Sequence, residues 1–114
     1  MTRFEGYAAL FDRVDRAGDV FRRGAFSGAP ATVPLLLQHR GTPVGRVRVA
    51  EDERGLVVMG EADVPVAAGQ GLSVGYRPVS VRRGARRELL AVDLVEVSLV
   101  AQPMQPLARV SAVF

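Results

Sequence analysis

The stretch GLSVGYRPVSVRRGARRELLAVDLVEVSLV, Gly71 to Val100, contains two long runs in which apolar residues tend to recur at every second position. A period of two is the pattern of a β-strand that buries one of its faces. Between the runs lies RRGARR, Arg82 to Arg87, whose charges and glycine are typical of a solvated turn. The stretch is therefore predicted to form a long β-hairpin, with strands over Gly71–Val81 and Arg87–Val100 and the arginines at its tip.

The same period continues on the N-terminal side of this hairpin. The segment VGRVRVAEDERGLVVMGEA, Val44 to Ala62, alternates, turns at Glu51–Gly55 and returns, which is a strong signal for a second hairpin. Three further runs have the length of a strand: Arg3–Phe11, Val33–His39 and the end of the C-terminal tail. Strands therefore account for most of the chain.

Helical patterns are nearly absent. Only Gly18–Ala29 and Val64–Gly71 could each hold a short helix, and neither has convincing caps or length. Several short strands with no helices to cover open edges favour closure of the sheet on itself. We expect a mainly β fold, a small closed or nearly closed antiparallel β-barrel with few short helices. The length of 114 residues predicts one domain, residues 1–114.

Composition excludes several classes of protein. Hydrophobic residues make up 48% of the chain and charged residues 24%, which is ordinary globular usage and excludes wholesale disorder. The absence of cysteine excludes disulfides, thiol nucleophiles and thiolate metal sites. No apolar run approaches the roughly 18 to 20 residues of a membrane span, and the N-terminus lacks the apolar centre of a signal peptide. We expect a soluble, cytoplasmic protein.

The chain is basic, with a net charge of +3, and all of its basic side chains apart from one histidine are arginine. Lysine, isoleucine, asparagine and tryptophan are all absent, which favours the codon bias of a GC-rich genome over selection for arginine chemistry. The one local concentration, Arg82–Arg87, could bind phosphate or an acidic peptide. A solvated hairpin tip is the commoner explanation.

Alternation also assigns the polar residues to faces of the predicted strands. Leu94, Glu96 and Ser98 share one face of the last long strand, and Asp93 lies on the other. A carboxylate and a hydroxyl are thus expected together on an otherwise strongly apolar strand. The chain's only histidine, His39, ends the run that carries Leu35 and Leu37 on the same face.

Ser73 lies between a leucine and a valine, with Gly71 and Gly75 two residues to either side. Serine, histidine and a carboxylate are the components of a hydrolase triad, in which the imidazole takes the hydroxyl proton and the acid orients the imidazole. Ordinary structural roles also account for all three: His39 bonded to a loop, Ser73 paired across the sheet, and Glu96 bound to an arginine. The residues alone leave both interpretations open.

Five segments, taken in their order along the chain, resemble those of a known protein family. They span Gly6 to Val110 and read GYAALFDRVDRAGDVFRRGAF, VPLLLQHRGTPVGRV, ERGLVVMGEA, GLSVGYR and DLVEVSLVAQPMQPLARV. In this order they resemble the prohead maturation proteases of tailed phages, a family also found in gene transfer agents. Those proteases are similar in fold to herpesvirus assemblin, a β-barrel serine peptidase that cleaves scaffold segments during capsid assembly.

The resemblance implies a serine endopeptidase of capsid maturation that needs no cofactor or metal. By motif it assigns the nucleophile to Ser73, the general base to His39 and the third member to the acid of DLVEVSLV. Alternation favours Glu96, with Asp93 as the runner-up, and assemblin-like enzymes have a histidine in this role that the chain lacks.

The resemblance also bears on partners and on residues around the site. The implied partners are the major capsid protein with its scaffold segment, and the chain itself as a substrate, within the assembling procapsid. A homodimer is left open, and neither a membrane nor a specific nucleic acid is expected. Gly71 and Gly75 are interpreted as leaving room for a substrate backbone. Arg77 and the arginines of Arg82–Arg87 are the candidates for an oxyanion-stabilising group.

The chain departs from the family pattern in one connection and in its C-terminal length. Typical members have a helix-forming segment before GLSVGY, whereas here only DVPVAAGQ, residues 63–70, is present, and typical members extend further at the C-terminus. A catalytically silent capsid-assembly scaffold protein is therefore one alternative. A basic nucleic-acid-binding barrel is another, weakened by an aromatic content of only 6%.

Overall fold

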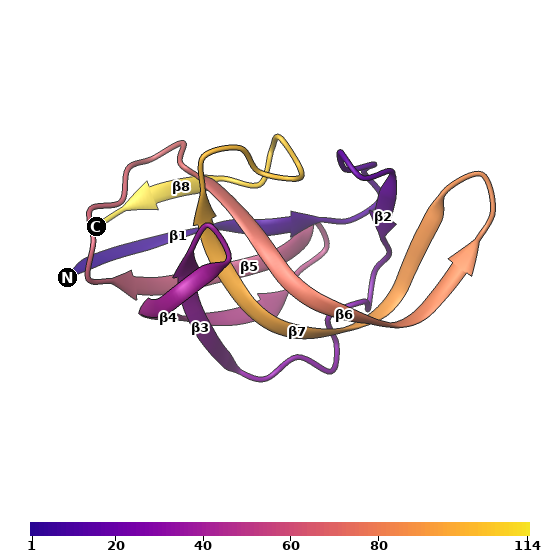
Figure 1. The fold of residues 1–114 in the computed structure, drawn as a ribbon, viewed down its shortest axis with the longest axis horizontal. Coiled ribbons are helices and arrows are strands. Elements are labelled where there is room, and N and C mark those ends of the chain that lie inside the picture. Colours follow the sequence, from indigo (N-terminus) through magenta and orange to yellow (C-terminus); the bar gives the residue numbers. More distant parts are fainter.

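The computed structural model describes all residues from 1 to 114 and is built from strands alone. The mainly β prediction is confirmed. The eight strands are β1 (Thr2–Leu10), β2 (Asp19–Phe21), β3 (Thr32–Leu37), β4 (Arg40–Glu51), β5 (Gly55–Ala62), β6 (Gly71–Arg83), β7 (Arg87–Val100) and β8 (Val110–Val113) (Figure 1). Since no part of the chain is helical, no helix has the length and hydropathy needed to cross a membrane.

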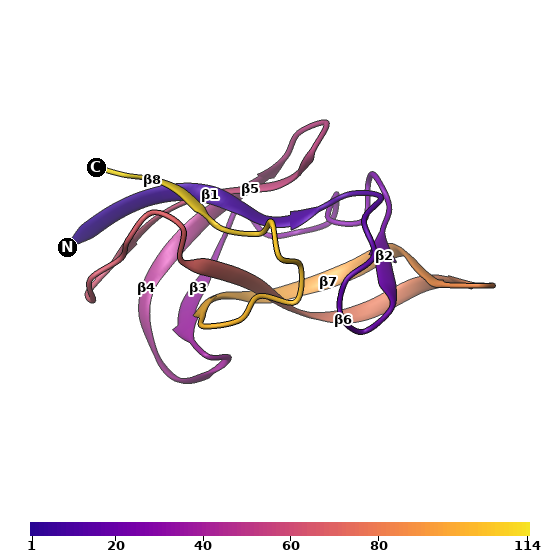
Figure 2. The ribbon, with the colours of Figure 1, turned by 90° about the horizontal axis from the view of Figure 1, so that it is seen from above.

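The sheet curls into a nearly closed barrel (Figure 2). Its hydrogen-bonded order runs β7-β3-β4-β5-β1-β8, and β6 pairs with the other edge of β7. The start of β6 then meets the segment that leads into β8. Leu72 N donates to Ala108 O at 2.9 Å, and Val110 N donates to Gln70 O at 2.8 Å. These bonds bring the two ends of the curled sheet together, so the predicted near-closure is confirmed.

One strand pair in this ring is parallel, and the expectation of a wholly antiparallel barrel is wrong at that point. β3 runs parallel to β7, with Leu35 opposite Val97, and the short β2 also pairs with β7 in parallel, outside the ring. The ring comprises β1, β5, β4, β3, β7, β6 and β8. A ring with an odd number of strands cannot alternate in direction throughout. At least one parallel neighbour is therefore required for closure.

Apolar side chains fill the inside of the barrel. The core cluster contains 21 buried residues, and its fully buried members come from every side of the ring, including Phe4, Leu35, Leu72 and Val97. Strands with one apolar face can bury that face in full only against other strands, which is the driving force for the curl. The core thereby holds the ends of β3, β6 and β7 in fixed relative positions.

The hairpin of β6 and β7 is longer than the barrel and projects from it on the side away from the two termini (Figure 1). Its pairing continues as far as Arg83 opposite Arg87, so the arginine cluster lies at the tip of a projecting arm, as predicted. The long axis of the molecule measures 43 Å, against 27 and 24 Å for the other two. The arm accounts for this elongation.

The expectation of short helices is wrong in both segments. Residues after β2 form successive tight turns, in which Ala25 N donates to Arg22 O and Ser27 N donates to Gly24 O, three residues back. Gly24 has a φ of +86°, a left-handed conformation that a right-handed helix cannot contain. Residues 64–71 form no helix either. The barrel needs no covering helix because its edges are nearly closed.

An ion-pair cluster joins the segment after β2 to the base of the projecting arm. Glu88 Oε1 accepts hydrogen bonds from Arg22 Nε at 2.7 Å and Arg82 Nη2 at 2.8 Å, and Glu88 Oε2 accepts one from Arg82 Nε at 2.8 Å. These hydrogen bonds, first those from Arg82 and then that from Arg22, lower the pKa of Glu88 to about 2. The ionised carboxylate therefore favours the folded arrangement.

Replacing Glu88 with glutamine is expected to change how the free energy of unfolding depends on pH. The pKa of Glu88 in the fold, about 2, lies below the roughly 4.3 of an unperturbed glutamate. Its stabilisation is therefore fully present above that higher value and is lost as the pH falls toward about 2. Urea unfolding from about pH 6 downward should show the difference between parent and variant shrinking below about pH 4.5. A difference that stays constant would contradict this, and Glu53→Gln, at an exposed carboxylate outside any ion pair, is the control.

Candidate active site

The three predicted site residues lie on three different elements that meet at one end of the barrel. Ser73 is near the start of β6, Glu96 is near the end of β7, and His39 is in the turn between β3 and β4. Across the β6–β7 pairing, Ser73 stands opposite Ser98 and Gly75 stands opposite Glu96. Residues that pair across neighbouring strands have side chains on the same face. The serine and the carboxylate are therefore neighbours by strand register.

His39 is not the last residue of a strand, as the sequence had predicted, but part of a two-residue turn. β3 ends at Leu37, which pairs with Arg40 at the start of β4. Gln38 and His39 between them have φ values of +52° and +61°. Positive φ at both central residues is the pattern of a type I′ hairpin turn, normally formed by glycine or asparagine. Alternation along a strand could not predict this conformation.

Bonds to β7 hold this turn in its costly conformation. Gln38 N donates to Leu99 O at 3.0 Å, and His39 N donates to the Ser98 hydroxyl at 3.0 Å. A non-glycine residue in a sparsely populated backbone region costs on the order of 1–3 kcal/mol and persists only where its surroundings enforce it. Such strain often occurs at functional sites. Here it directs the imidazole toward the end of β7.

Glu96 connects the imidazole to the barrel interior. The residue is 6% exposed, its Oε1 lies 2.5 Å from His39 Nδ1, and its Oε2 accepts a hydrogen bond from Ser98 Oγ at 2.7 Å. An ionised carboxylate only accepts hydrogen bonds, so the proton of this contact belongs to Nδ1. The other ring nitrogen, Nε2, is then free to accept a proton. Asp93, the runner-up, is exposed on the opposite face of β7.

Ser98 has a positional role that the sequence analysis did not assign. Its fully buried hydroxyl donates to Glu96 and accepts from the backbone of His39, so it touches both partners of the hydrogen-bonded pair. The signal for this role was present in the sequence as a hydroxyl two residues from Glu96 on the same face. What the strand pattern could not show was that the turn at His39 would reach it.

Ser73 is the least constrained of the three side chains. It is 8% exposed, and its hydroxyl takes part in none of the side-chain hydrogen bonds of the chain, in contrast to that of Ser98. Ser73 and His39 line the same small pocket, of about 110 Å³, without a direct hydrogen bond between them. Contacts between nucleophile and base are often long in the absence of substrate and shorten when it binds. The arrangement supplies a hydroxyl and an imidazole at one cavity, with the imidazole bonded to the buried acid Glu96.

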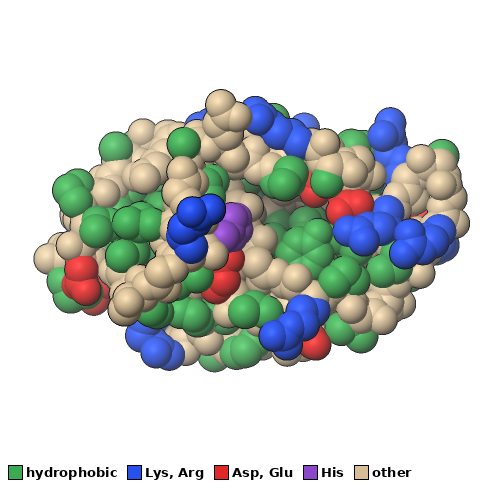
Figure 3. All heavy atoms as spheres, in the orientation of Figure 1, with side chains coloured by type: hydrophobic (Ala, Val, Ile, Leu, Met, Phe, Trp, Pro, Cys, Tyr) green, Lys and Arg blue, Asp and Glu red, His purple; other side chains and the backbone are tan.

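The molecular surface agrees with this description. Figure 3 shows the imidazole of the chain's only histidine at the surface, with an acidic side chain directly beside it. The side chain of His39 is 41% exposed, against 8% for the side chain of Glu96. A ligand can therefore reach the imidazole, while the acid behind it is shielded from water. No three His, Asp or Glu side chains form a group that could hold a metal ion.

The two glycines beside Ser73 do not leave space for a substrate backbone, and that interpretation is wrong. A Cβ built on Gly75 would meet Glu96 Oε1, and would also lie 2.8 Å from Glu96 Cδ. A Cβ on Gly71 would lie 2.7 Å from Val100 O and 2.8 Å from Pro103 Cδ. The chain itself occupies both spaces. Gly75 is needed because the carboxylate lies across β6 directly above it.

Replacing Gly75 with alanine is expected to displace the Glu96 carboxylate from His39. The new methyl group would require Glu96 to move, and misplacement of a catalytic group by about 1 Å costs on the order of 10²-fold in rate. Overpacking of this kind also lowers stability by about 1–3 kcal/mol. Both kcat and Tm should therefore fall. Gly84→Ala, at a tip position with open space around it, is the control and should change neither. A fully active Gly75→Ala protein would contradict the role that the sequence predicts for Glu96.

Most of the predicted oxyanion-stabilising arginines lie far from Ser73. At about 3.3 Å per residue, Arg82 is roughly 30 Å along β6 from the serine. Arg82 pairs with Glu88, and Arg87 forms two hydrogen bonds to Asp19, at 2.8 and 2.6 Å. The tip cluster therefore contributes to the structure of the arm. Arg77, exposed and four residues from Ser73, is the nearest candidate of that set along the strand.

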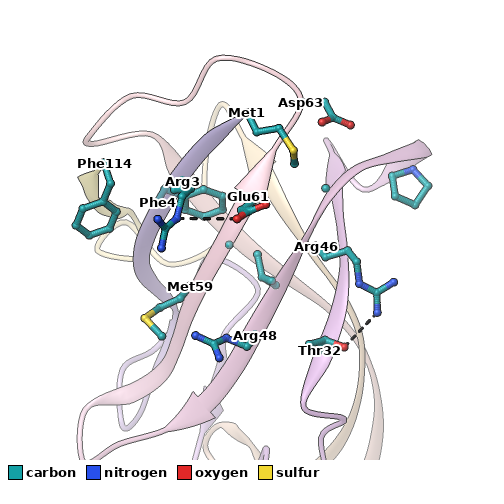
Figure 4. Close-up of a pocket in the computed structure, with 14 residues that line it drawn as sticks. Met1, Arg3, Phe4, Thr32, Arg46, Arg48, Met59, Glu61, Asp63 and Phe114 are labelled. Carbon is teal, nitrogen blue, oxygen red and sulfur yellow. Dashed lines mark hydrogen bonds and ion pairs between the residues drawn. The ribbon is translucent and has the colours of Figure 1, made fainter.

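The largest hollow of the molecule is elsewhere. It has a volume of about 620 Å³ and lies over β1, β4 and β5, next to both termini (Figure 4). Three arginines line it, Arg3, Arg46 and Arg48, of which Arg3 pairs with Glu61 at 3.9 Å and Arg46 donates to the Thr32 hydroxyl at 3.1 Å. None of the three candidate residues reaches it. Ser73 and His39 instead line a smaller and separate pocket, and Glu96 contacts His39 from outside its lining.

Comparisons with known proteins give two matches. The whole chain, residues 1–114, matches the profile of the family described as Caudovirus prohead serine protease. The chain is also similar to a protein named Prohead protease from Enterobacteria phage HK97, with 37% identity over 92 residues that cover 64% of this chain and 41% of that protein. The chain thus spans less than half the length of this relative. No solved structure matches it.

Proposed function

Because this chain belongs to the Caudovirus prohead serine protease family, we propose that it is a serine endopeptidase of capsid maturation. Ser73 is the nucleophile, His39 the general base and Glu96 the acid that orients it. One observation carries the assignment. The buried Glu96 carboxylate holds Nδ1 of His39 and leaves Nε2 free, beside a pocket that Ser73 also lines.

The geometry supports an acyl-enzyme mechanism. Ser73 Oγ attacks the scissile carbonyl carbon while its proton passes to Nε2 of His39, and the resulting imidazolium is stabilised by Glu96. Nε2 then donates that proton to the leaving amine as the C–N bond breaks, which leaves an ester on Ser73. A water molecule, deprotonated by the same nitrogen, hydrolyses the ester and regenerates the serine. No metal or cofactor takes part in these steps.

The substrate proposed for this activity is the major capsid protein with its scaffold segment, together with the chain itself. The support is the family description and the name of the HK97 relative, since a prohead is an assembling capsid. The place of action follows from the substrate and is the interior of the assembling procapsid. The fold supports the activity by holding the three side chains on β6, β7 and the β3–β4 turn.

Co-expression with the cognate major capsid protein tests the proposal. Intact mass spectrometry of both chains should show a shortened capsid protein, and the mass difference identifies the cut. A fluorophosphonate probe, which reacts with activated serine hydroxyls, should label the purified chain at Ser73 and not at the exposed Ser27 or Ser80.

Two results would contradict the proposal. A capsid protein that stays at full length while bound to this chain would favour the silent scaffold alternative. Labelling at a serine other than Ser73, with cleavage intact, would retain the protease and move its nucleophile.

A further inference from the structure

The pocket that Ser73 and His39 share has an interior of mixed character. Hydrophobic and aromatic side chains form most of its lining, among them Phe21, Leu72 and Tyr76. Phe21 and Tyr76 pack edge to face, with ring centroids 5.1 Å apart. The volume of about 110 Å³ corresponds to three or four water molecules at about 30 Å³ each. A pocket of this size admits one side chain of a bound peptide.

Asp15 is the one acidic residue in the lining. It is 8% exposed and lies in the loop between β1 and β2. Its Oδ1 accepts hydrogen bonds from the backbone N–H groups of Ala17 at 2.8 Å and Asp19 at 3.0 Å. Its Oδ2 has no hydrogen-bond partner in the chain. Both hydrogen bonds from the protein thus use Oδ1, and Oδ2 is available to a ligand.

No cation forms an ion pair with Asp15. Burial, the largest cause, raises the pKa of Asp15 overall, because it removes water from around the ionised carboxylate. The charge of Arg87 lowers the pKa of Asp15, but its guanidinium is bonded to both oxygens of Asp19. A positive group placed in the pocket would supply a compensating charge. A buried, unpaired carboxylate beside the proposed nucleophile therefore indicates the chemistry of the ligand.

We propose that this pocket receives the side chain of the residue on the N-terminal side of the scissile bond, and that Asp15 selects a basic residue there. This inference rests on the proposed function and names the specificity of the same site. The methylene stem of the substrate side chain packs against Phe21 and Tyr76, and its cationic head reaches Asp15 Oδ2. Lysine is preferred to arginine, because a guanidinium binds best to two free carboxylate oxygens and Asp15 offers only one.

Asp15→Asn is the variant that tests the charge separately from the turn. Asparagine keeps an Oδ1 that can accept the two backbone hydrogen bonds, so the loop should retain its shape, while the negative charge is lost. The substrates are two peptides that span the cleavage site found by co-expression. They differ only in having lysine or the uncharged norleucine before the cut.

The parent is expected to cleave the lysine peptide faster, and Asp15→Asn should lower its kcat/KM by about 10²-fold. The norleucine peptide should be cleaved equally well by both proteins. Asp63→Asn, at an exposed aspartate outside this pocket, is the control and should match the parent. Equal kcat/KM for the two peptides in the parent, or a cut after an acidic residue, would overturn the inference while leaving the protease intact.

A binding measurement separates the pocket from catalysis. In the Ser73→Ala protein, a product-like peptide that ends in lysine should bind more tightly than its norleucine counterpart, and Asp15→Asn should remove the difference. If no cleavage occurs with any peptide but this preference is present, the proposed function fails and the pocket stands. If cleavage occurs and the preference is absent, the inference about Asp15 fails.

Discussion

Replacing Ser73 with alanine is expected to lower kcat for capsid-protein cleavage by roughly 10⁶-fold, the loss seen when a triad serine or histidine is removed. The reason is chemical, because alanine has no oxygen to form the acyl-enzyme. The fold should be unaffected, since the Ser73 hydroxyl takes part in none of the side-chain hydrogen bonds that hold Glu96, Ser98 and His39 together. Timed mass spectrometry of the co-expressed proteins measures the rate. Thermal unfolding should give an unchanged Tm.

Two further variants, Ser80→Ala and His39→Asn, complete this prediction. Ser80→Ala removes an exposed hydroxyl from the same strand and should leave kcat unchanged. His39→Asn should match Ser73→Ala in its loss of activity, because an amide is no base at neutral pH. Asparagine tolerates the left-handed conformation that His39 adopts, with φ of +61°, so the turn should survive the change. Cleavage at the parent's rate by either Ser73→Ala or His39→Asn would exclude the proposed mechanism.

Glu96→Gln is expected to lower kcat by roughly 10⁴-fold, as the comparable change does in a serine protease triad. Glutamine has nearly the same shape, so it should fit against Ser98 and above Gly75. Its amide, however, donates where the carboxylate accepted, which favours the tautomer of His39 with the proton on Nε2. That tautomer cannot take the proton of Ser73, and the imidazolium also loses its counter-charge. Single-turnover cleavage of the capsid protein measures the loss.

Asp93→Asn is the informative comparison for this prediction. Asp93 is the alternative acid from the sequence, and it lies exposed on the outer face of β7, away from His39. Its replacement should leave kcat within a factor of about two of the parent's. A large loss for Asp93→Asn together with an active Glu96→Gln protein would reverse the assignment of the third member.

Alternation along a strand predicted the contact of Glu96 with Ser98 but not its contact with Gly75. Alternation along one strand predicted that Glu96 and Ser98 share a face, and their 2.7 Å hydrogen bond confirms this. The function of Gly75 could not be inferred in this way. Its neighbour above the strand is Glu96, which is set by the register between β6 and β7. Register depends on every contact across the hairpin and on its bulges. The alternation of residues within a single strand gives no information about either.

His39 is the residue for which the sequence was least informative. A strand pattern ran through it, yet the chain reverses at Gln38 and His39 in a conformation that glycine or asparagine normally adopts. The backbone preferences of histidine alone do not predict a two-residue turn with positive φ at this position. The turn is held by bonds to Leu99 and Ser98, which are about 60 residues away in the sequence. The catalytic role of the three side chains itself stays a prediction until the variants are measured.

The amino-acid sequence by itself determined the class of fold, because a period of two and the near-absence of helical periods require strands with one buried face. It also determined the family, since ordered motifs survive in the linear chain. Only the tertiary structure decided which residues meet. The odd-numbered ring requires at least one parallel pair, and the pair of β3 with β7 brings the turn at His39 against Ser98 and Glu96. Long-range contacts of this kind arise from closing the barrel around a shared core, and no local pattern encodes them.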